Sequence, residues 1–582
     1  MSQRLRIQIA GQSGAGLLSV GLIIIRALRD IGYYVVADRE YPSLIKGGHS
    51  LFTINVSDEP IYALSNTADI FVSIDKVSLK AYFNNLKDNG IWIHGYERLA
   101  GIKDIQEQGQ ARGITEIHLP TRETAKSVGG SDLMQNVVLV GMIWKVLGLD
   151  FEPVEAEITT KFGKKPKWLP FNIAAAKAGY DGVETQGAIK DEYFSVKPGN
   201  QERRIIIDGN HAVALGAVHG GVRVYYAYPM SPSSSILTHM ANMAKDTGMV
   251  VKQAEDEITV ANLCLGSSYA GTRSMCGTSG GGFDLMTETV SLAGIVEVPW
   301  VCCVVQRPGP ATGLPTWTGQ GDLKLAIHAG HGEFARIVVA VSDPADAFDL
   351  TQEALNAAEK YQCPVIILSD KSIAESLLTL PEFEQGKIKI ERHLVEGKSL
   401  ENIESHDRYK ITDSGISKRW IPGSNSEAYY FSNGDEHDEM GRLDESEQAG
   451  EMYAKRVRKL ETIVKELPEP LVFGDEKNAD ISFVGWGSTK GPILDTIAHF
   501  AGIGVSVNYL HFQWVHPIRI ERLEQFFDEN ENVHLAEGNY NGQLGKLIEK
   551  ETHLEFGGKL LKWNGRPFFL EDLEVYIKQH IK

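Results

Sequence analysis

The chain has 582 residues, enough for about four domains of ordinary size. Its hydrophobic content of 43% and charged content of 23% exclude a disordered chain, a fibre and a disulfide-rich miniprotein. The net charge is −18, and without a basic stripe we expect no nucleic-acid partner. No apolar run reaches the roughly 18–20 residues that a membrane span needs, so we expect no membrane anchor and a cytoplasmic location.

The cysteines and acidic runs give little sign of a metal site. The chain has five cysteines, an odd number, and no CxxC pair. This pattern indicates a reducing compartment and argues against a disulfide framework, a structural zinc or an iron–sulfur cluster held by this chain alone. The acidic run 436–439 contains a histidine and could bind a metal, but in so acidic a linker we predict no metal ligand.

The first 195 residues are predicted to form one α/β domain. Strands are expected at 6–10, 34–36, 70–74 and 91–94, and helices at 17–31 and 133–149. Because strands alternate with helices, we predict a parallel sheet. The domain is expected to end near residue 195, in a polar stretch.

Two further α/β domains are predicted. In residues 196–380, the pattern indicates strands at 221–227, 300–305, 337–341 and 364–369 and helices at 258–270 and 344–360. Residues 381–470 are strongly charged and are interpreted as an extended linker with a charged helix at 452–467. Strands return at 481–484, 505–509 and 533–537, which predicts a third domain over 471–582.

A glycine loop joins the first strand to the first helix. It runs Gly11-Gln-Ser13-Gly14-Ala-Gly16, and its backbone N–H groups could face an anion. The loop lacks the lysine of a P-loop, and Ser13 replaces the middle glycine of a dinucleotide fingerprint. Phosphate binding and a tight turn remain equally open. Lys46, in Lys-Gly-Gly-His-Ser, could form a second wall of the same site or belong to a hairpin turn.

Two turns in the second domain are candidate binding elements. The segment 228–235 reads Tyr-Pro-Met-Ser-Pro-Ser-Ser-Ser, so two prolines stiffen the backbone on either side of Ser231. Its last three serines are expected to cap the next helix. The turn 278–283, Thr-Ser-Gly-Gly-Gly-Phe, could allow close approach to a flat ring. Each could equally be a structural turn without chemistry.

Charged candidates flank these turns. Glu255, Asp256 and Glu257 precede a helix, where carboxylates commonly complement the helix dipole. If one of them is buried, it could share a proton with a ring nitrogen. Arg307 follows a strand on a stiff Pro/Gly loop and could bind a carboxylate with two hydrogen bonds. Asp322 is its alternative, purely structural partner.

These motifs, in this order, resemble one family. The chain resembles the alpha subunits of 2-oxoacid:ferredoxin oxidoreductases with a gamma domain fused in front, and the 2-oxoglutarate enzymes most of all. The resemblance covers nearly the whole chain and rests on the loop from Gly11 and on segments 46–50, 209–210, 228–235, 255–258, 278–280, 306–322, 409–423, 436–438, 537–544 and 565–568.

The resemblance implies a fold and a reaction. The three domains would be a gamma-type domain, a thiamine-pyrimidine-binding domain and a transketolase C-terminal-like domain. Thiamine diphosphate would attack the keto carbon of a 2-oxoacid, carbon dioxide would leave, coenzyme A would take the acyl group, and two electrons would pass singly through iron–sulfur clusters to ferredoxin. Some members run the reverse, carbon-dioxide-fixing reaction. The favoured substrate is 2-oxoglutarate, with pyruvate or a broad range of 2-oxoacids as the alternative.

The resemblance also implies roles on the cofactor. Glu257 would hydrogen-bond the aminopyrimidine ring and promote formation of the reactive ylid, with Glu255 as the second choice. Tyr228 and Pro229 would contribute to the same cofactor site.

On the substrate, Arg307 would bind the carboxylate, with Thr312 as a further contact. Ser231 would bind the substrate or the acyl intermediate, although many relatives carry threonine there. The loop Gly11–Gly16 and Lys46 are the candidates for coenzyme A.

The chain lacks half of such a site. It contains no Gly-Asp-Gly, the motif that holds the diphosphate and Mg²⁺, and no cysteines in a cluster-binding pattern. A separate beta subunit is therefore expected to supply the diphosphate half and a 4Fe–4S cluster, in a dimer of alpha–beta pairs. Two other classes stay open: a flavin or nicotinamide oxidoreductase acting alone, and a non-catalytic binding subunit.

Overall fold

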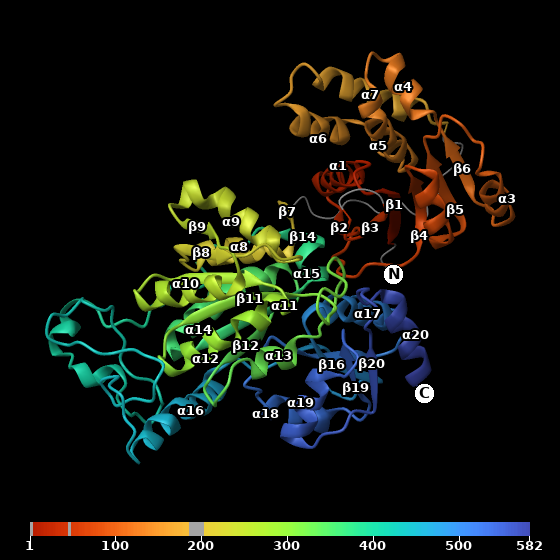
Figure 1. The fold of residues 1–582 in the computed structure, drawn as a ribbon. Coiled ribbons are helices and arrows are strands. Elements are labelled where there is room, and N and C mark those ends of the chain that lie inside the picture. Colours follow the sequence, from red (N-terminus) through yellow and green to blue (C-terminus); the bar gives the residue numbers. More distant parts are fainter. Residues whose placement is uncertain (1–3, 45–47, 185–202, 476, 582) are drawn as a thin grey trace. The chain divides into compact units, whose positions relative to one another are not determined.

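The computed structural model describes residues 4–44, 48–184, 203–475 and 477–581. The chain divides into two compact units (Figure 1). The first comprises Met1–Ile207, Ser376–Glu382 and Phe569–Val575, and the second comprises Asp208–Glu375, Phe383–Phe568 and Tyr576–Lys582. Both are α/β and together they contain three sheets, which confirms the predicted fold class. The boundaries at 195, 380 and 470 stay predictions, and residue 195 lies outside the described residues.

The first unit contains an eight-stranded sheet. Its order is β6-β5-β4-β1-β3-β2-β14-β7. The strands are β1 (Leu5–Gln12), β2 (Tyr34–Glu40), β3 (His49–Ser57), β4 (Ala68–Ser73), β5 (Leu86–His94), β6 (Thr115–His118), β7 (Arg204–Ile207) and β14 (Leu377–Pro381).

The prediction of a parallel first sheet was wrong. Strands β1, β4, β5 and β6 are parallel neighbours, but β3 lies antiparallel between β1 and β2, and β14 lies antiparallel between β2 and β7. Only residues 41–48 separate β2 from β3, which is too short for a helical crossover. The chain therefore reverses in a hairpin, and β7 and β14 join the sheet from distant parts of the sequence.

Some helices of the first unit pack on this sheet, and others pack on those helices. Together they are α1 (Leu17–Asp30), α2 (Lys76–Tyr82), α3 (Lys103–Ala111), α4 (Thr121–Ser127), α5 (Gln135–Val146), α6 (Glu152–Phe162) and α7 (Leu169–Asp181). Helix α1 buries Val20, Ile24 and Leu28 at helical spacing, and the same core includes α5 and residues of α6 and α7. The apolar stretch predicted at 133–149 is thus a buried helix.

The second unit is built on a seven-stranded sheet of order β18-β12-β13-β11-β10-β8-β9. Its strands are β8 (Val224–Ala227), β9 (Val250–Gln253), β10 (Ser274–Thr278), β11 (Trp300–Gln306), β12 (Ile337–Ala340), β13 (Pro364–Asp370) and β18 (Trp514–His516). All neighbours are parallel except β12 and β18. Its helices are α8 (Gly209–His219), α9 (Ser234–Thr247), α10 (Glu257–Tyr269), α11 (Gly280–Phe283), α12 (Thr287–Ile295), α13 (Leu323–His328), α14 (Pro344–Tyr361) and α15 (Lys371–Glu375).

A five-stranded sheet completes the second unit, with the order β15-β17-β16-β19-β20. It consists of β15 (Leu471–Gly474), β16 (Ile481–Trp486), β17 (Val507–Phe512), β19 (Val533–Glu537) and β20 (Gly558–Leu561), with α17 (Lys490–Ala501), α18 (Glu521–Glu529) and α19 (Gln543–Thr552). The last helix, α20 (Leu570–His580), is divided between the two units. Strand β18 follows β17 directly but pairs with β12 of the other sheet. One hydrophobic core contains residues of both sheets, so the two are packed together.

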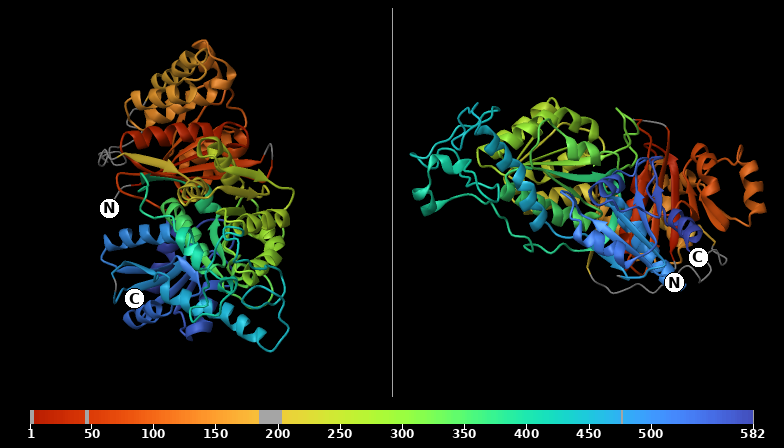
Figure 2. Two further views of the ribbon diagram at one scale, coloured as in Figure 1. Left: turned by 90° about the vertical axis from the view of Figure 1, so that its left-hand side faces the viewer. Right: turned by 90° about the horizontal axis from the view of Figure 1, so that it is seen from below.

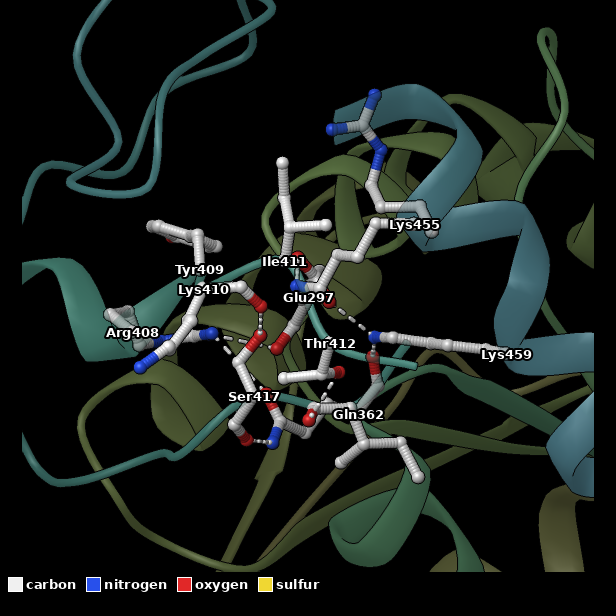
Figure 3. A network of polar contacts seen from close by, with 12 residues as sticks. Glu297, Gln362, Arg408, Tyr409, Lys410, Ile411, Thr412, Ser417, Lys455 and Lys459 are labelled. Atoms are coloured by element: carbon white, nitrogen blue, oxygen red, sulfur yellow. Dashed lines mark hydrogen bonds and ion pairs between the residues drawn. The ribbon is translucent and has the colours of Figure 1, made fainter. Parts of the chain in front are cut away.

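Residues 383–448 form loops with two short 3-10 helices, Gly397–Asn402 and Ser405–Arg408, and lead into α16 (Ala449–Glu466). Figure 2 shows this segment beside the helices of the seven-stranded sheet. Their attachment is ionic as well as apolar. The buried carboxylate of Glu297 pairs with Lys455 at 2.6 Å and with Lys459 at 2.5 Å, and Arg408 donates to the Glu297 carbonyl at 2.8 Å (Figure 3). Burial alone would raise the pKa of Glu297, but these three cations hold it below its ordinary value. Part of the charge in this segment is therefore internal.

All five cysteines are buried and unbridged. Among the described residues, no three or more His, Cys, Asp and Glu side chains are grouped as metal ligands would be. Within the same residues, no helix has the length and apolar character needed to span a membrane.

Candidate functional site

Four parallel strands of the second unit end at one edge of their sheet. Strands β9, β8, β10 and β11 are consecutive neighbours, and in parallel α/β sheets ligands bind beyond the carboxyl ends of the strands. Tyr228 and Pro229 follow β8, the turn 279–282 follows β10, and Arg307 follows β11. The topology thus brings the predicted cofactor and substrate residues of this unit to the same edge.

Glu257 is the buried member of the three successive carboxylates. It is 3% exposed at the start of α10, whereas Glu255 is exposed and Asp256 caps the helix by accepting the Thr259 N–H at 2.7 Å. Glu257 Oε1 has no hydrogen-bond partner among the described residues. A Cβ atom on Gly282 would lie 2.5 Å from that oxygen, so only glycine permits this approach. Glu255, the second candidate for the carboxylate that shares a proton with the cofactor ring, is exposed and so lacks the burial that this role requires.

Arg307 is half-buried and is held by the backbone of residues 228–235, which we call the serine segment. Its Nη1 donates to the Ser231 carbonyl oxygen at 2.7 Å, which leaves the other guanidinium N–H groups for a ligand. Burial lowers the pKa of Arg307, and attraction to Asp322 opposes this. The side chains of Ser231 and Thr312 are exposed. Arg307 therefore contacts the serine segment through Ser231, and its interaction with Asp322 is electrostatic.

The serine segment is positioned by a residue whose role the sequence did not reveal. Asn210 is fully buried in α8, and its Nδ2 donates to the Pro232 carbonyl at 2.8 Å and to Ser235 Oγ at 2.7 Å. The expected serine capping of α9 was wrong. Ser233 occupies the N-cap position with helical φ and ψ, and its hydroxyl donates to the Met230 carbonyl at 2.7 Å. A lone amide in the first turn of an apolar helix was the signal that could have identified Asn210.

The loop that carries Arg307 is fixed at its other end by the five-stranded sheet. Buried Gln320 accepts from the Gly538 N–H at 2.6 Å and donates to the Trp486 carbonyl at 2.8 Å. Its own carbonyl accepts from Asn539 at 3.0 Å. Glu537 lies beneath this contact and accepts from the Trp486 indole at 2.9 Å. The 537–540 motif therefore anchors the loop after β11.

In the first unit, the glycine loop lies at a cavity. Gly14 and Gly16 have φ of 90° and 84°, and α1 begins without a side-chain cap, so its first N–H groups are left for a ligand. The cavity measures about 890 Å³ and its lining includes Gly14, Gly16, Lys165, Lys167 and Trp168.

Two other residues of this loop, Gly11 and Ser13, lie against neighbouring parts of the fold. Ser13 Oγ is hydrogen-bonded to Ser50 Oγ at 2.8 Å, and the Gly11 backbone packs on Leu17 and Ile74. Both therefore have structural contacts of their own. Lys46 lies outside the described residues.

Comparison with known proteins agrees with this arrangement. Residues 215–449 match the family described as pyruvate flavodoxin/ferredoxin oxidoreductase, thiamine diP-bdg, and residues 6–182 match pyruvate ferredoxin/flavodoxin oxidoreductase. The 2-oxoacid:ferredoxin oxidoreductase subunit alpha of Sulfolobus sp is 34% identical over 100% of this chain and 97% of its own length. The 2-oxoglutarate oxidoreductase subunit KorA of Mycobacterium tuberculosis is 28% identical over 98% and 91%.

A solved structure in the comparison matches the whole chain. The 2-oxoglutarate:ferredoxin oxidoreductase from Magnetococcus marinus, determined with 2-oxoglutarate, coenzyme A and succinyl-CoA bound, has a TM-score of 0.91 and 31% identity, and the match covers 100% of both chains. The resemblance seen in the sequence is confirmed: the chain belongs to the 2-oxoacid:ferredoxin oxidoreductase family, as an alpha subunit.

Proposed function

We propose that this alpha subunit holds the pyrimidine half of thiamine diphosphate and the carboxylate of a 2-oxoacid, with 2-oxoglutarate as the favoured substrate. The observation that carries the proposal is the buried Glu257 carboxylate, whose Oε1 lacks a partner and lies against a glycine turn. Buried polar atoms are rarely left unpaired, so such an atom at the carboxyl edge of a parallel sheet favours a bound ligand.

The residues at this edge fit the pyrimidine ring. Glu257 Oε1 is available to share a proton with a ring nitrogen, and Gly282 leaves room for the carboxylate beside the turn. When bound, thiamine diphosphate supplies the nucleophilic carbon that attacks the keto group and accepts the charge left by departing carbon dioxide. Glu257 assists by holding a proton at the ring nitrogen, and exposed Tyr228 with Pro229 contributes to the surface the ring meets.

Arg307 would bind the substrate carboxylate. One of its N–H groups is used by the Ser231 carbonyl, and the remaining ones keep the planar geometry that a carboxylate needs. Ser231 and Thr312, both exposed, are the nearby hydroxyl groups that we assign to the substrate. The choice of 2-oxoglutarate over pyruvate follows the names of the Magnetococcus and Mycobacterium relatives. The ratio of kcat/KM for the two acids tests it.

Coenzyme A would use the cavity of the first unit. Lys165 and Lys167 offer cations for phosphate groups, and partly exposed Trp168 offers a ring on which adenine can stack. The uncapped start of α1 adds N–H groups of the kind that bind phosphate. We keep Lys46 as a candidate for the same ligand.

A beta subunit would complete the enzyme. We assign to it the diphosphate and Mg²⁺ site and the 4Fe–4S cluster that passes electrons to ferredoxin, in a cytoplasmic dimer of alpha–beta pairs. The support is that the sequence lacks Gly-Asp-Gly and any CxxC pair, and that its five cysteines are buried.

The test is Glu257→Gln in the alpha–beta complex. Glutamine keeps the shape but cannot hold the proton, so turnover should fall by about 10²–10⁴-fold. The matched control is Glu255→Gln, which changes an exposed carboxylate two residues away and should stay within twofold of wild type. Unchanged turnover in Glu257→Gln would instead favour a binding subunit without catalytic residues, and a flavin spectrum in the isolated chain would favour the other rival.

A further inference from the structure

Three buried polar atoms without partners surround one turn of the second unit. Among the described residues, Glu257 Oε1, Ser279 Oγ and Asp322 Oδ2 accept and donate no hydrogen bond. All three lie at the turn 279–282, which follows β10. The proposed function accounts for Glu257, but it leaves the Asp322 carboxylate unexplained.

Asp322 lies on the other face of this turn from Glu257. A Cβ atom on Gly280 would overlap Asp322 Oδ2, just as one on Gly282 would overlap Glu257 Oε1. Residues two positions apart in a helix are separated by about 200° of rotation about its axis. The two glycines therefore admit carboxylates from opposite sides. The two acids therefore have separate surroundings and separate roles.

The surroundings of Asp322 centre on Arg307. The backbone N–H of Asp322 donates to Gln306 Oε1 at 3.0 Å, which holds it beside the end of β11, next to Arg307. Two charged groups act on its carboxyl: Asp284, exposed in the turn Asp284–Met286, and Arg307. Burial is the main cause that raises the pKa of Asp322, and Asp284 adds to it. Arg307 lowers it, and the net pKa is about 6. The positive charge of Arg307 therefore favours the ionised form of Asp322.

We propose that Asp322 is a positioning residue that balances the charge of Arg307 in the free site and takes up a proton when a substrate carboxylate binds there. The proposal rests on the proposed role of Arg307. A 2-oxoacid brings a second negative charge to the same guanidinium, and like charges at one site favour protonation of one of them. A proton moves from solvent to Asp322 Oδ2, and no other bond changes. When the substrate carboxylate leaves as carbon dioxide, Asp322 is again the nearby negative charge that acts on Arg307, and the proton returns to solvent.

The test measures protons taken up on binding. The thiamine-loaded alpha–beta complex is titrated calorimetrically at pH 7 with N-oxalylglycine and with oxamate, unreactive analogues of 2-oxoglutarate and pyruvate, in two buffers of different ionisation enthalpy. With a pKa of about 6, only about a tenth of Asp322 is protonated beforehand, so uptake should approach one proton per site. Affinity should then fall by up to about tenfold per pH unit above 6.

Asp322→Asn should bind the analogue with almost no proton uptake and with little pH dependence. Glu288→Gln is the matched control, an exposed carboxylate on α12 that is not among the groups acting on Asp322, and should keep the uptake. No uptake by the wild-type complex, or unchanged uptake in Asp322→Asn, overturns the inference while Arg307 keeps its role. If Arg307→Lys binds the analogue as tightly as wild type, the carboxylate contact itself is wrong and the inference fails with it.

Discussion

Replacing Gly282 by alanine should disable Glu257 without removing it. The backbone at Gly282 accepts an L side chain, but the added Cβ would lie 2.5 Å from Glu257 Oε1 and would also overlap the Thr278 hydroxyl. Relief of such overpacking typically costs about 1–3 kcal/mol, and it is obtained here by moving the carboxylate. Because a positioned proton-transfer group contributes about 10²–10⁴-fold, kcat should fall by at least about 100-fold.

Gly281→Ala is the matched control for this change. A Cβ there meets only the Ala311 carbonyl oxygen, at 3.8 Å, which is an ordinary contact, so activity should stay within twofold. The assay is 2-oxoacid-dependent reduction of a viologen dye by the alpha–beta complex, with the thermal midpoint measured alongside. In Thr278→Ala/Gly282→Ala the hydroxyl overlap is gone but the Glu257 overlap remains, so activity should stay low. Wild-type kcat in Gly282→Ala, with a normal thermal midpoint, would refute the placement of Glu257.

Three further predictions follow from other contacts. Arg307→Lys should raise KM for the 2-oxoacid and lower kcat, because a two-point contact becomes a one-point contact; steady-state kinetics equal to wild type would contradict this. Glu297→Gln leaves two buried lysines without a counter-charge, so it should lower the free energy of unfolding by about 3–5 kcal/mol, seen as a lower thermal midpoint. The control Glu107→Gln, in an exposed ion pair, should lower it by at most about 1 kcal/mol. Equal shifts of the thermal midpoint in the two variants would count against internal pairing of Glu297. Trp168→Ala should raise KM for coenzyme A and leave KM for the 2-oxoacid unchanged, as measured from initial rates. An unchanged KM for coenzyme A with a raised KM for the 2-oxoacid would exclude the cavity as the nucleotide site.

Much of the fold follows from local patterns. The buried strands of the seven-stranded sheet, such as β11 and β13, are continuous apolar runs, and such runs between glycine-rich or proline-rich turns are typical of parallel sheets. The first sheet was harder because its pairing is not local. Strands β7 and β14 are about 170 residues apart, and no pattern within either segment indicates its partner. Strand β3 was not predicted from the sequence, which offered a hairpin turn only as one of two interpretations of the segment around Lys46.

The site residues show the same limit. The sequence placed three carboxylates before α10, but which one is buried depends on Gly282, a residue from another strand–helix turn. Arg307 was recognisable from its stiff loop after a strand. The contact of Gln320 with the five-stranded sheet and the orphan oxygen of Asp322 exist only after two distant segments have packed together. The burial and hydrogen-bond partners of these side chains, which decide their chemical roles, are set by the tertiary structure.

The most direct test of the central claim is the structure of the alpha–beta complex with thiamine diphosphate bound. A ring nitrogen of the pyrimidine should lie within hydrogen-bond distance of Glu257 Oε1, about 2.6–3.2 Å, with the diphosphate on the beta subunit. A pyrimidine ring located away from the carboxyl edge of β8 and β10, with Glu257 still unpartnered, would contradict the account.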